Sequence, residues 1–521
     1  MHEIELKLSV DETTLEQLAK AKPPKGFAVS EQSVKRLRSV YYDTPDHTLK
    51  KARISLRTRH NGTNWLQTIK QGGGMQSGLS KRIELELPIA GIEPDFHVIS
   101  DNEIKQKLLS LLEGKQWGIL FETAITRTLT YYTDKAGAKI EVALDSGIAK
   151  TATKEHPIHE VELELMEGPV ESLYKLAGAL MKDRPILFSS SNKAGIGYRL
   201  ASGEPPELPS EALHSNYIEL EPGDNAGSAF QKILSECLNQ IVANRSCVLQ
   251  QNISEGPHQL RVGLRRLRSA FNIYKAAFPG NETIAALDVS AKQLATTAGN
   301  QRDIDVLVED IITPVIPLLP DTHSVEPLFE AIKLAHVEAQ IELRQELIDP
   351  KLNGFLLQLG ELAHSSAWKE NLGLSEFKKL DLPIQTFAQN ALSKRWKACE
   401  KRAENLQDLT IEQRHDLRKS LKKLRYTVEF FRSLYEPEDL RIFLKCLKRL
   451  QNTFGYLNDV AMADRLVAMK LPQSLQNNEV STVIGFVAGW HQARADNAWL
   501  EAQERWNAAV EAPKYWLQAK A

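Results

Sequence analysis

The sequence has few cysteines, no long hydrophobic run and almost no net charge. Its four cysteines, at positions 237, 247, 399 and 446, lie far apart without a CxxC spacing, which argues against a disulfide scaffold or a zinc site. No apolar run approaches the roughly 18 residues of a membrane span, and the acidic residues of the first ten positions argue against a secretory signal. We therefore expect a cytoplasmic protein. The 65 Lys and Arg nearly balance the 67 Asp and Glu, so an anionic partner must be recognised by local basic clusters.

The chain divides into two halves with different periodicity. At 521 residues it exceeds what one hydrophobic core usually supports, so we expect two or more domains. Apolar and polar residues alternate up to about residue 200, and helical spacing dominates beyond about residue 225. A Pro/Glu/Ser-rich stretch, ASGEPPELPSEALHSN, separates the two. The sequence predicts a β-rich domain over 1–201, a linker over 202–217 and an all-helical domain over 218–510.

Several expected strands carry a charged face opposite an aliphatic face. In the opening MHEIELKLSV, Glu3, Glu5 and Lys7 alternate with apolar residues, and RISLRTR, KRIELEL, KIEVALD and EVELEL repeat the pattern. A sheet with a solvated charged face and a closed barrel with inward charges both fit, and the barrel requires that acids, bases, metal ions and a charged ligand neutralise one another. Arg dominates the basic positions. Because guanidinium groups grip phosphate in two places, this choice favours the barrel.

The first half resembles the CYTH superfamily, also called triphosphate tunnel metalloenzymes. Glu3, Glu5 and Lys7 form its ExExK signature, and YYDTPDHTL, ISLRTR, WLQTIK, RIELELP, IEVALD, HEVELEL and SNKAGIGYRL follow in the order of that family. The resemblance covers residues 1–201. It implies an antiparallel eight-stranded β tunnel barrel with flanking helices, which binds triphosphate and a divalent metal, Mg²⁺ or Mn²⁺.

The resemblance also implies roles for individual residues. Catalysis is assigned to Lys7, Glu3 and Glu5. The metal carboxylates are Glu3, Glu5, Glu162, Glu164, Asp145 and Glu84. The phosphate-binding cations are Lys7, Arg57, Arg59, Lys70, Arg82, Arg127 and Lys193. Carboxylate oxygens suit Mg²⁺ or Mn²⁺, and phosphoryl transfer mainly requires positioning and charge neutralisation. Some relatives pair the motif lysine with a tyrosine, and the sequence leaves open whether Tyr41 or Tyr42 has that place.

The helical half repeats itself. HQLRVGLRRLRSAFNIY, from His258, aligns without a gap with HDLRKSLKKLRYTVEFF, from His415, which predicts an internal duplication of a helical bundle. Basic residues at i, i+3, i+7 and i+10 form one stripe on each helix. A solvated face would explain one such helix, but the recurrence on both repeats favours an anion-binding surface.

These repeats resemble the CHAD domain over about residues 218–510. The resemblance implies a domain that binds inorganic polyphosphate along a basic surface. The residues carried over are His258, Arg261, Arg265, Arg268, Lys292, His415, Arg418, Lys422, Arg425 and Lys448.

Together these features predict a cytoplasmic, divalent-metal-dependent enzyme that hydrolyses inorganic triphosphate to pyrophosphate and orthophosphate, associated with polyphosphate granules through its helical domain. One alternative keeps the fold and changes the substrate: a nucleotide or thiamine triphosphatase, or a class IV-type adenylate cyclase. Another is a non-catalytic polyphosphate-binding or granule-targeting protein. We expect neither nucleic acid nor a membrane as partner, because the stripes lack interleaved aromatics and a reader motif.

Overall fold

The computed structural model describes residues 2–71, 75–189, 192–206, 211–319, 325–369, 372–468 and 478–517. The chain forms two compact units. The strand unit comprises residues 1–211 together with 348–367, and the helical unit comprises residues 212–347 and 368–521. The domain limits expected from the sequence, 1–201, 202–217 and 218–510, remain a proposal.

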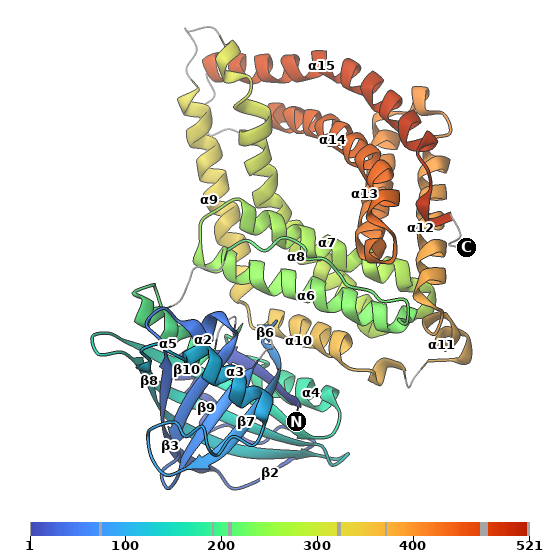
Figure 1. Ribbon diagram of the computed structural model, residues 1–521. Helices are drawn as coiled ribbons and strands as arrows, with labels where there is room; N and C mark the ends of the chain where they lie inside the picture. Colours follow the sequence, from blue (N-terminus) through green and yellow to red (C-terminus); the bar gives the residue numbers. More distant parts are fainter. Residues whose placement is uncertain are drawn as a thin grey trace. The chain divides into compact units, whose positions relative to one another are not determined.

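The strand unit is one antiparallel sheet with helices packed on it (Figure 1). Its strands in the described residues are β1 (His2–Ser9), β2 (Phe27–Val29), β3 (Ser33–Asp43), β4 (Ile54–His60), β5 (Trp65–Gln71), β6 (Met75–Gln76), β7 (Leu79–Ile89), β8 (Gly118–Asp134), β9 (Lys139–Lys150), β10 (Glu155–Glu167) and β11 (Leu187–Phe188). The strand order is β11-β1-β10-β9-β8-β3-β4-β5-β7-β6, β2 pairs with β8, and β1 also pairs with β7.

Both faces of the opening strand are buried. Leu6 and Leu8 are 0% exposed, but Glu5 and Lys7 on the other face are only 5% and 7% exposed. A sheet with a solvated charged face would leave such side chains in water. The charged face is therefore an interior face, and its ionised groups need partners within the protein.

The helices of the strand unit lie on both sides of this sheet. They are α1 (Glu12–Ala19), α2 (Thr48–Lys51), α3 (Asn102–Leu112), α4 (Val170–Met181), α5 (Lys193–Ser202) and α10 (Lys351–His364). Helix α5 packs on the charged face, where Leu200 joins a cluster with Leu37 and Ile125, and α10 packs on α4. Asp11, Asp101 and Asn192 cap α1, α3 and α5 by accepting hydrogen bonds from backbone N–H groups. Beneath α2 and α3, an apolar cluster includes Tyr42 and Leu56.

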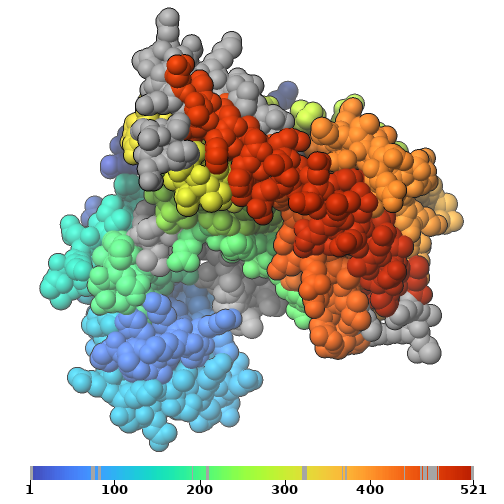
Figure 2. Space-filling model, turned by 90° about the horizontal axis from the view of Figure 1, so that it is seen from above, coloured from blue at the N-terminus to red at the C-terminus, as the bar shows by residue number. Residues whose placement is uncertain are grey.

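The helical unit has two groups of packed helices (Figure 1). Its longer helices are α6 (Ala226–Gln250), α7 (Glu255–Tyr274), α8 (Glu282–Val306), α9 (Glu326–Ile348), α12 (Ile384–Arg402), α13 (Ile411–Phe431), α14 (Pro437–Ala468) and α15 (Asn478–Glu511), with a shorter α11 (Leu374–Leu380). The two aligned basic motifs lie on α7 and α13. Figure 2 shows α15, in red, across one face of this unit. None of the described helices is long and apolar enough to cross a bilayer.

Candidate active site

Lys7 lies between two carboxylates on the interior face. Its Nζ is 2.8 Å from Glu5 Oε1 and 2.5 Å from Glu162 Oε1. Burial alone would lower the pKa of Lys7, but the charges of Glu162 and Glu5 outweigh it and raise that pKa above its usual value. The ammonium group therefore stays protonated at neutral pH.

The backbone of Lys7 is also fixed on both sides. Its N–H donates to the carbonyl of Gly78 at 2.9 Å, and its carbonyl accepts from the N–H of Ser189 at 3.1 Å. Gly78 has φ +76°, and a Cβ there would lie 2.7 Å from the Lys7 carbonyl oxygen. Only glycine allows this turn to approach β1 so closely.

A second set of ion pairs surrounds Asp145 and Glu162. Arg127 donates from Nε and Nη2 to the two oxygens of Asp145 at 2.7 and 2.6 Å, and also pairs with Glu162. Lys193, the first residue of α5, lies 2.7 Å from Glu162 Oε1 and 2.8 Å from Asp145 Oδ2, and pairs with Glu160. Despite burial, Lys193 and its neighbours hold the pKa of Glu162 well below its usual range and lower that of Asp145. We call Glu5, Lys7, Arg127, Asp145, Glu160, Glu162 and Lys193 the buried ionic cluster.

Three further cations extend this cluster along β4 and β5. Arg57 Nη2 and Lys70 Nζ contact the two oxygens of Glu84 at 3.4 and 2.6 Å. Arg59 donates from Nε to Ser39 Oγ at 2.9 Å, and burial together with the charge of Arg57 lowers its pKa to about 10. The buried Nε of Arg57 has no hydrogen-bond partner among the described atoms. These cations are only partly neutralised, as expected of a site for an anion.

A row of carboxylates crosses three neighbouring strands. Glu164 is the register partner of Glu5 on β1 and of Glu141 on β9. Burial, followed by the charges of Glu5 and Glu141, raises the pKa of Glu164 to about 7. Burial and the charge of Glu162 likewise raise the pKa of Glu5. Glu5, Glu141 and Glu164 therefore form a row of like charge across neighbouring strands, whereas the acids among the described residues whose oxygens lie close enough together to share a metal ion are Asp145, Glu160 and Glu162.

The acids nearest the bases form a different group. One oxygen each from Asp145, Glu160 and Glu162 lies within 4.8 Å of the others. Lys7, Arg127 and Lys193 already pair with these acids. The bases therefore compete with a metal ion at this group, whereas Glu5, Glu141 and Glu164 have fewer basic partners.

The structure thus brings together most of the residues singled out from the sequence. Glu5, Lys7, Arg57, Lys70, Glu84, Arg127, Asp145, Glu162 and Lys193 interact directly in the ion pairs given above, and Glu164 and Arg59 respond to the charges of this network. Glu3 and Arg82 are register partners in the β1–β7 pair, but their side chains lie outside the described residues. Their roles remain predictions.

Sequence reasoning missed Glu141 and Glu160 as site residues. Glu141 lies an even number of residues from Asp145 on β9, and Glu160 lies two residues before Glu162 on β10. Both side chains therefore point to the same face as a predicted residue, and this alternation alone could have identified them as members of the site.

The two adjacent tyrosines face opposite sides of β3. Tyr41 stacks on Phe121, with ring centroids 4.4 Å apart. Burial raises its pKa, but Arg57 and Arg59 outweigh burial and lower it. Tyr42 instead donates to the carbonyl of Ile92 at 2.7 Å within the apolar cluster. Tyr41 is therefore the tyrosine on the charged face.

In the helical unit, several residues of the predicted basic stripes have acidic partners. Arg261 contacts Asp303 at 2.8 Å, Arg268 contacts Asp288 at 2.9 Å, and Arg425 contacts Glu429 at 2.7 Å. Lys292 and Lys448 are exposed. Burial and the charges of Arg302, Arg265 and Arg261 lower the pKa of His258, with Glu255 opposing them.

Cations from three helices also gather beside the stripes. Burial and then the charges of Arg395, Arg402, Arg268 and Lys419 lower the pKa of Lys423. We call these five residues, from α7, α12 and α13, the helical basic cluster. The sequence did not single out Arg395, Arg402, Lys419 or Lys423, because the packing of α12 against α13 is not visible in a linear motif.

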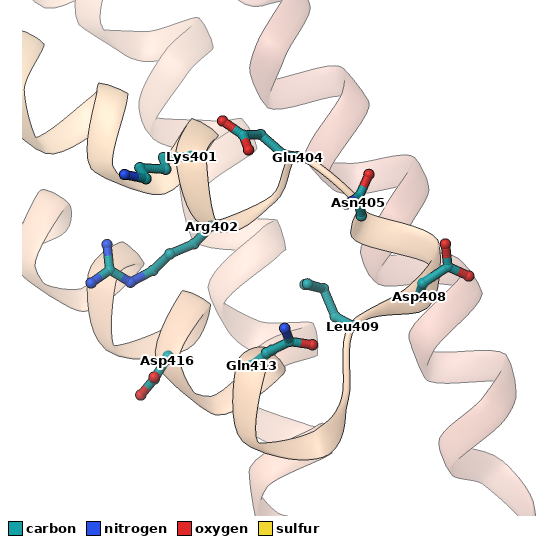
Figure 3. A pocket seen from close by; sticks show the side chains of 8 residues that line it. All are labelled: Lys401, Arg402, Glu404, Asn405, Asp408, Leu409, Gln413 and Asp416. Carbon is teal, nitrogen blue, oxygen red and sulfur yellow. The ribbon is translucent and has the colours of Figure 1, made fainter.

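A cavity of about 650 Å³ lies at the corner between α12 and α13 (Figure 3). Its lining mixes the signs of charge: Lys401 and Arg402 accompany Glu404, Asp408 and Asp416. The cavity therefore has no excess of positive charge, unlike the helical basic cluster, and no excess of negative charge, unlike the row of Glu5, Glu141 and Glu164.

Comparison with known proteins divides the chain in the same way as its periodicity. Residues 1–197 match the family model of the CYTH domain, and residues 232–468 match that of the CHAD domain. An inorganic triphosphatase from Haemophilus influenzae is 33% identical over 204 residues, which are 39% of this chain and 56% of that protein. The match thus spans little more than half the length of that relative.

An uncharacterized protein from Mycobacterium tuberculosis is 24% identical over 416 residues, 77% of this chain and 76% of its own. Among solved structures, a CHAD domain from the plant Ricinus communis has 27% identity and a TM-score of 0.48, covering 58% of this chain and 99% of that one. A putative adenylyl cyclase from Hippeastrum, described as having a dominant triphosphatase activity, has 19% identity and a TM-score of 0.27, covering 40% of this chain and 98% of that one.

Proposed function

We propose that this chain, which joins a CYTH domain to a CHAD domain, is a divalent-metal-dependent triphosphatase that hydrolyses inorganic triphosphate to pyrophosphate and orthophosphate. The single observation that carries this proposal is the buried ionic cluster, in which Lys7, Arg127 and Lys193 meet acids on an interior face. Burying so many ionised groups is costly even when they pair with one another, and a site that binds a charged ligand is a reason to retain them. The similarity to an inorganic triphosphatase supports the same reaction.

The proposed substrate channel is an eight-stranded barrel. The pairing of β1 with both β10 and β7 supports this, because it links β1, β10, β9, β8, β3, β4, β5 and β7 in a ring. For the helical half we infer an internal duplication, supported by the placement of the aligned motifs on α7 and α13.

In this proposal the basic side chains bind and orient the triphosphate. Lys7 remains protonated, because its pKa is raised, and donates to phosphate oxygens. Arg57 offers its unpartnered Nε, and Arg59, Arg127 and Lys193 complete the cationic lining. These charges offset the negative charge of the phosphate chain as the terminal P–O bond breaks.

The proposed metal ligands are Glu5 and Glu164, with Glu141 beside them and Glu3 as a further predicted member. A bound Mg²⁺ or Mn²⁺ would offset phosphate charge and lower the pKa of a coordinated water. Asp145, Glu162 and Glu84, also predicted as ligands, have basic partners, so we assign them first to holding the cations in place.

Free triphosphate is the proposed substrate because the part of the interior face between Lys7 and Lys193 is lined by ion-paired side chains, whereas a base or thiazole ring needs apolar surface. The test is phosphate release by the full chain from triphosphate, ATP and thiamine triphosphate, with Mg²⁺, Mn²⁺ or EDTA. We expect triphosphate to be the best substrate and EDTA to abolish turnover. Preferred turnover of ATP or thiamine triphosphate, or formation of cyclic AMP, would replace the substrate assignment.

A matched pair of variants tests catalysis and metal binding separately. Glu5→Gln should lose activity and weaken Mn²⁺ binding in calorimetry, whereas Glu31→Gln, at an exposed site of the same unit, should retain both. If neither the parent protein nor Glu5→Gln hydrolyses triphosphate with either metal, the non-catalytic binding function takes its place.

For the helical unit we infer binding of inorganic polyphosphate, and with it association with polyphosphate granules. The supporting observation is the helical basic cluster, in which burial and then the charges of Arg395, Arg402, Arg268 and Lys419 lower the pKa of Lys423. Because like charges repel when no anion is near, a polyanion that bridges α7, α12 and α13 would relieve this repulsion.

A further inference from the structure

Helix α10 belongs to the strand unit, although the chain on both sides of it belongs to the helical unit. It lies beside α4 (Figure 1). The two helices approach closely at Gly360, where a Cβ would lie 2.5 Å from the ring of Tyr174. Only a residue without a side chain allows this contact, so the pair has the form of a specific docking interface.

Side chains of α10 also complete α4 itself. The Nδ2 of Asn353, a buried residue, donates to the carbonyls of Arg184 at 2.7 Å and Met181 at 3.4 Å. Met181 ends α4, and carbonyls in the last turn of a helix lack partners within that helix. Asn353 therefore acts as a C-cap supplied from a distant part of the sequence.

Two more contacts lie at the other end of the interface. His364 stacks on Tyr174 with an angle of 9° between the rings. Burial raises the pKa of Glu361, while Lys175 of α4 lowers it and Glu171 of α4 raises it, so this carboxylate faces charges on α4. Contacts thus run along the whole length of α4.

The position of α4 in the chain makes these contacts relevant to the buried ionic cluster. Directly before α4 comes β10, which carries Glu160 and Glu162. Directly after it, β11 pairs with β1 beside Lys7, and Lys193 follows. Contacts that hold α4 in place should therefore also restrict the motion of β10 and of the segment that leads to Lys193.

We propose that residues 348–367 are an intramolecular docking segment, which holds α4 and through it β10 and Lys193 of the ionic cluster. This proposal goes beyond the proposed function and does not depend on which substrate is hydrolysed. The element that carries this effect is the packed pair of α10 and α4, both of which belong to the strand unit.

Hydrogen exchange on the full chain without ligand tests it. Gly360→Leu should place its side chain in the ring of Tyr174 and undock α10, whereas Gly354→Leu, on the same helix with nothing within 4 Å of its Cβ position, is the matched control. We expect the amides of residues 170–181 to exchange at least tenfold faster in Gly360→Leu only, with faster exchange in 155–167 and 187–193 as well. Residues 226–250 of the helical unit should not change.

Each outcome decides a part of the proposal. Equal exchange of residues 170–181 in both variants would refute docking. Faster exchange of 170–181 with unchanged 155–167 and 187–193 would refute the transmission to the ionic cluster. If Gly360→Leu does not fold, Asn353→Asp replaces it, because the carboxylate keeps the shape but cannot donate to the carbonyls of Met181 and Arg184.

Discussion

Lys7 and Glu162 face each other on neighbouring strands, with Nζ 2.5 Å from Oε1 and their Cα atoms in register between β1 and β10. Glu162 also pairs with Arg127 and Lys193. One carboxylate thus connects cations from β1, β8 and α5, and its own pKa is held well below the usual range.

Replacing the shared cation should abolish the proposed hydrolysis of triphosphate. Lys7→Met leaves Glu5 and Glu162 without the ammonium group between them and removes a donor to phosphate. We expect kcat/KM for triphosphate to fall about 100-fold or more, while circular dichroism keeps its shape. Lys22→Met, at an exposed position, is the control, and a loss below about threefold in Lys7→Met would contradict the role of Lys7.

Two glycine substitutions should change stability in opposite directions. A Cβ at Gly197 of α5 would lie 2.1 Å from the ring of Phe121, on which Tyr41 stacks, whereas one at Gly178 of α4 would meet nothing within 4 Å. Gly197→Ala should lower the free energy of unfolding by about 2 kcal/mol. Gly178→Ala should raise it by about 0.5–1 kcal/mol, because alanine favours the helix.

Urea denaturation of the two variants measures these changes. A Gly197→Ala protein as stable as the parent would mean that the ring of Phe121 can move away, and that α5 does not depend on the stacked aromatic pair.

The pH dependence of stability should contain a contribution from His258. Its pKa in the folded protein lies below the ordinary value of 6.5, so the unfolded chain binds the proton more readily. The free energy of unfolding should therefore fall as the pH drops through 6.5 and stop falling below the folded pKa. Urea midpoints between pH 8 and 5 measure this slope.

His258→Gln should flatten that slope, and His97→Gln, in a loop of the strand unit, should leave it unchanged. A slope that is the same in all three proteins would mean that burial and the charges of Arg302 and Arg265 do not hold His258 in its neutral form.

The helical basic cluster should contribute to polyphosphate binding and not to turnover. Arg395→Ala combined with Lys423→Ala removes two of its five cations, so we expect the Kd for polyphosphate to rise about tenfold and its salt dependence to weaken. Triphosphate turnover should remain that of the parent. Lys445→Ala, on the exposed side of α14, is the control.

Arg261→Ala combined with Arg418→Ala tests the predicted stripes in the same assay. If this pair weakens binding and the Arg395/Lys423 pair does not, the polyanion follows the stripes on α7 and α13 and does not cross to α12.

Alternation along single strands predicted much of the strand unit and its site. Strand parity placed Glu5, Lys7, Arg57 and Glu162 on the charged face, because parity is a local property of the sequence, and the resemblance to the CYTH superfamily implied their roles. The same parity could have yielded Glu141 and Glu160. Which acids pair with bases and which remain for a metal could not be predicted, because it depends on the register between strands, as between Glu5 and Glu164.

Features that depend on packing between distant segments were not predicted. The meeting of Arg395 with Lys423 requires α12 to pack against α13, and no spacing within either helix encodes that contact. Helix α10 reads as one more helix of a long helical region, and its contacts with α4, such as that of Gly360 with Tyr174, assign it to the strand unit. The orientation of Tyr41, left open by the sequence, follows from its stacking on Phe121.

The remote cap on α4 has a practical consequence for anyone who shortens this chain. A fragment ending at residue 211 would retain all the strands of the described residues and all members of the buried ionic cluster. It would also expose the side of α4 that carries Tyr174, and the carbonyls of Met181 and Arg184 would lose the hydrogen bonds from the side-chain amide of Asn353. Such a fragment should aggregate more readily and show lower activity than the full chain. Low activity of the fragment would then reflect the loss of α10 and not a defect in the ionic cluster.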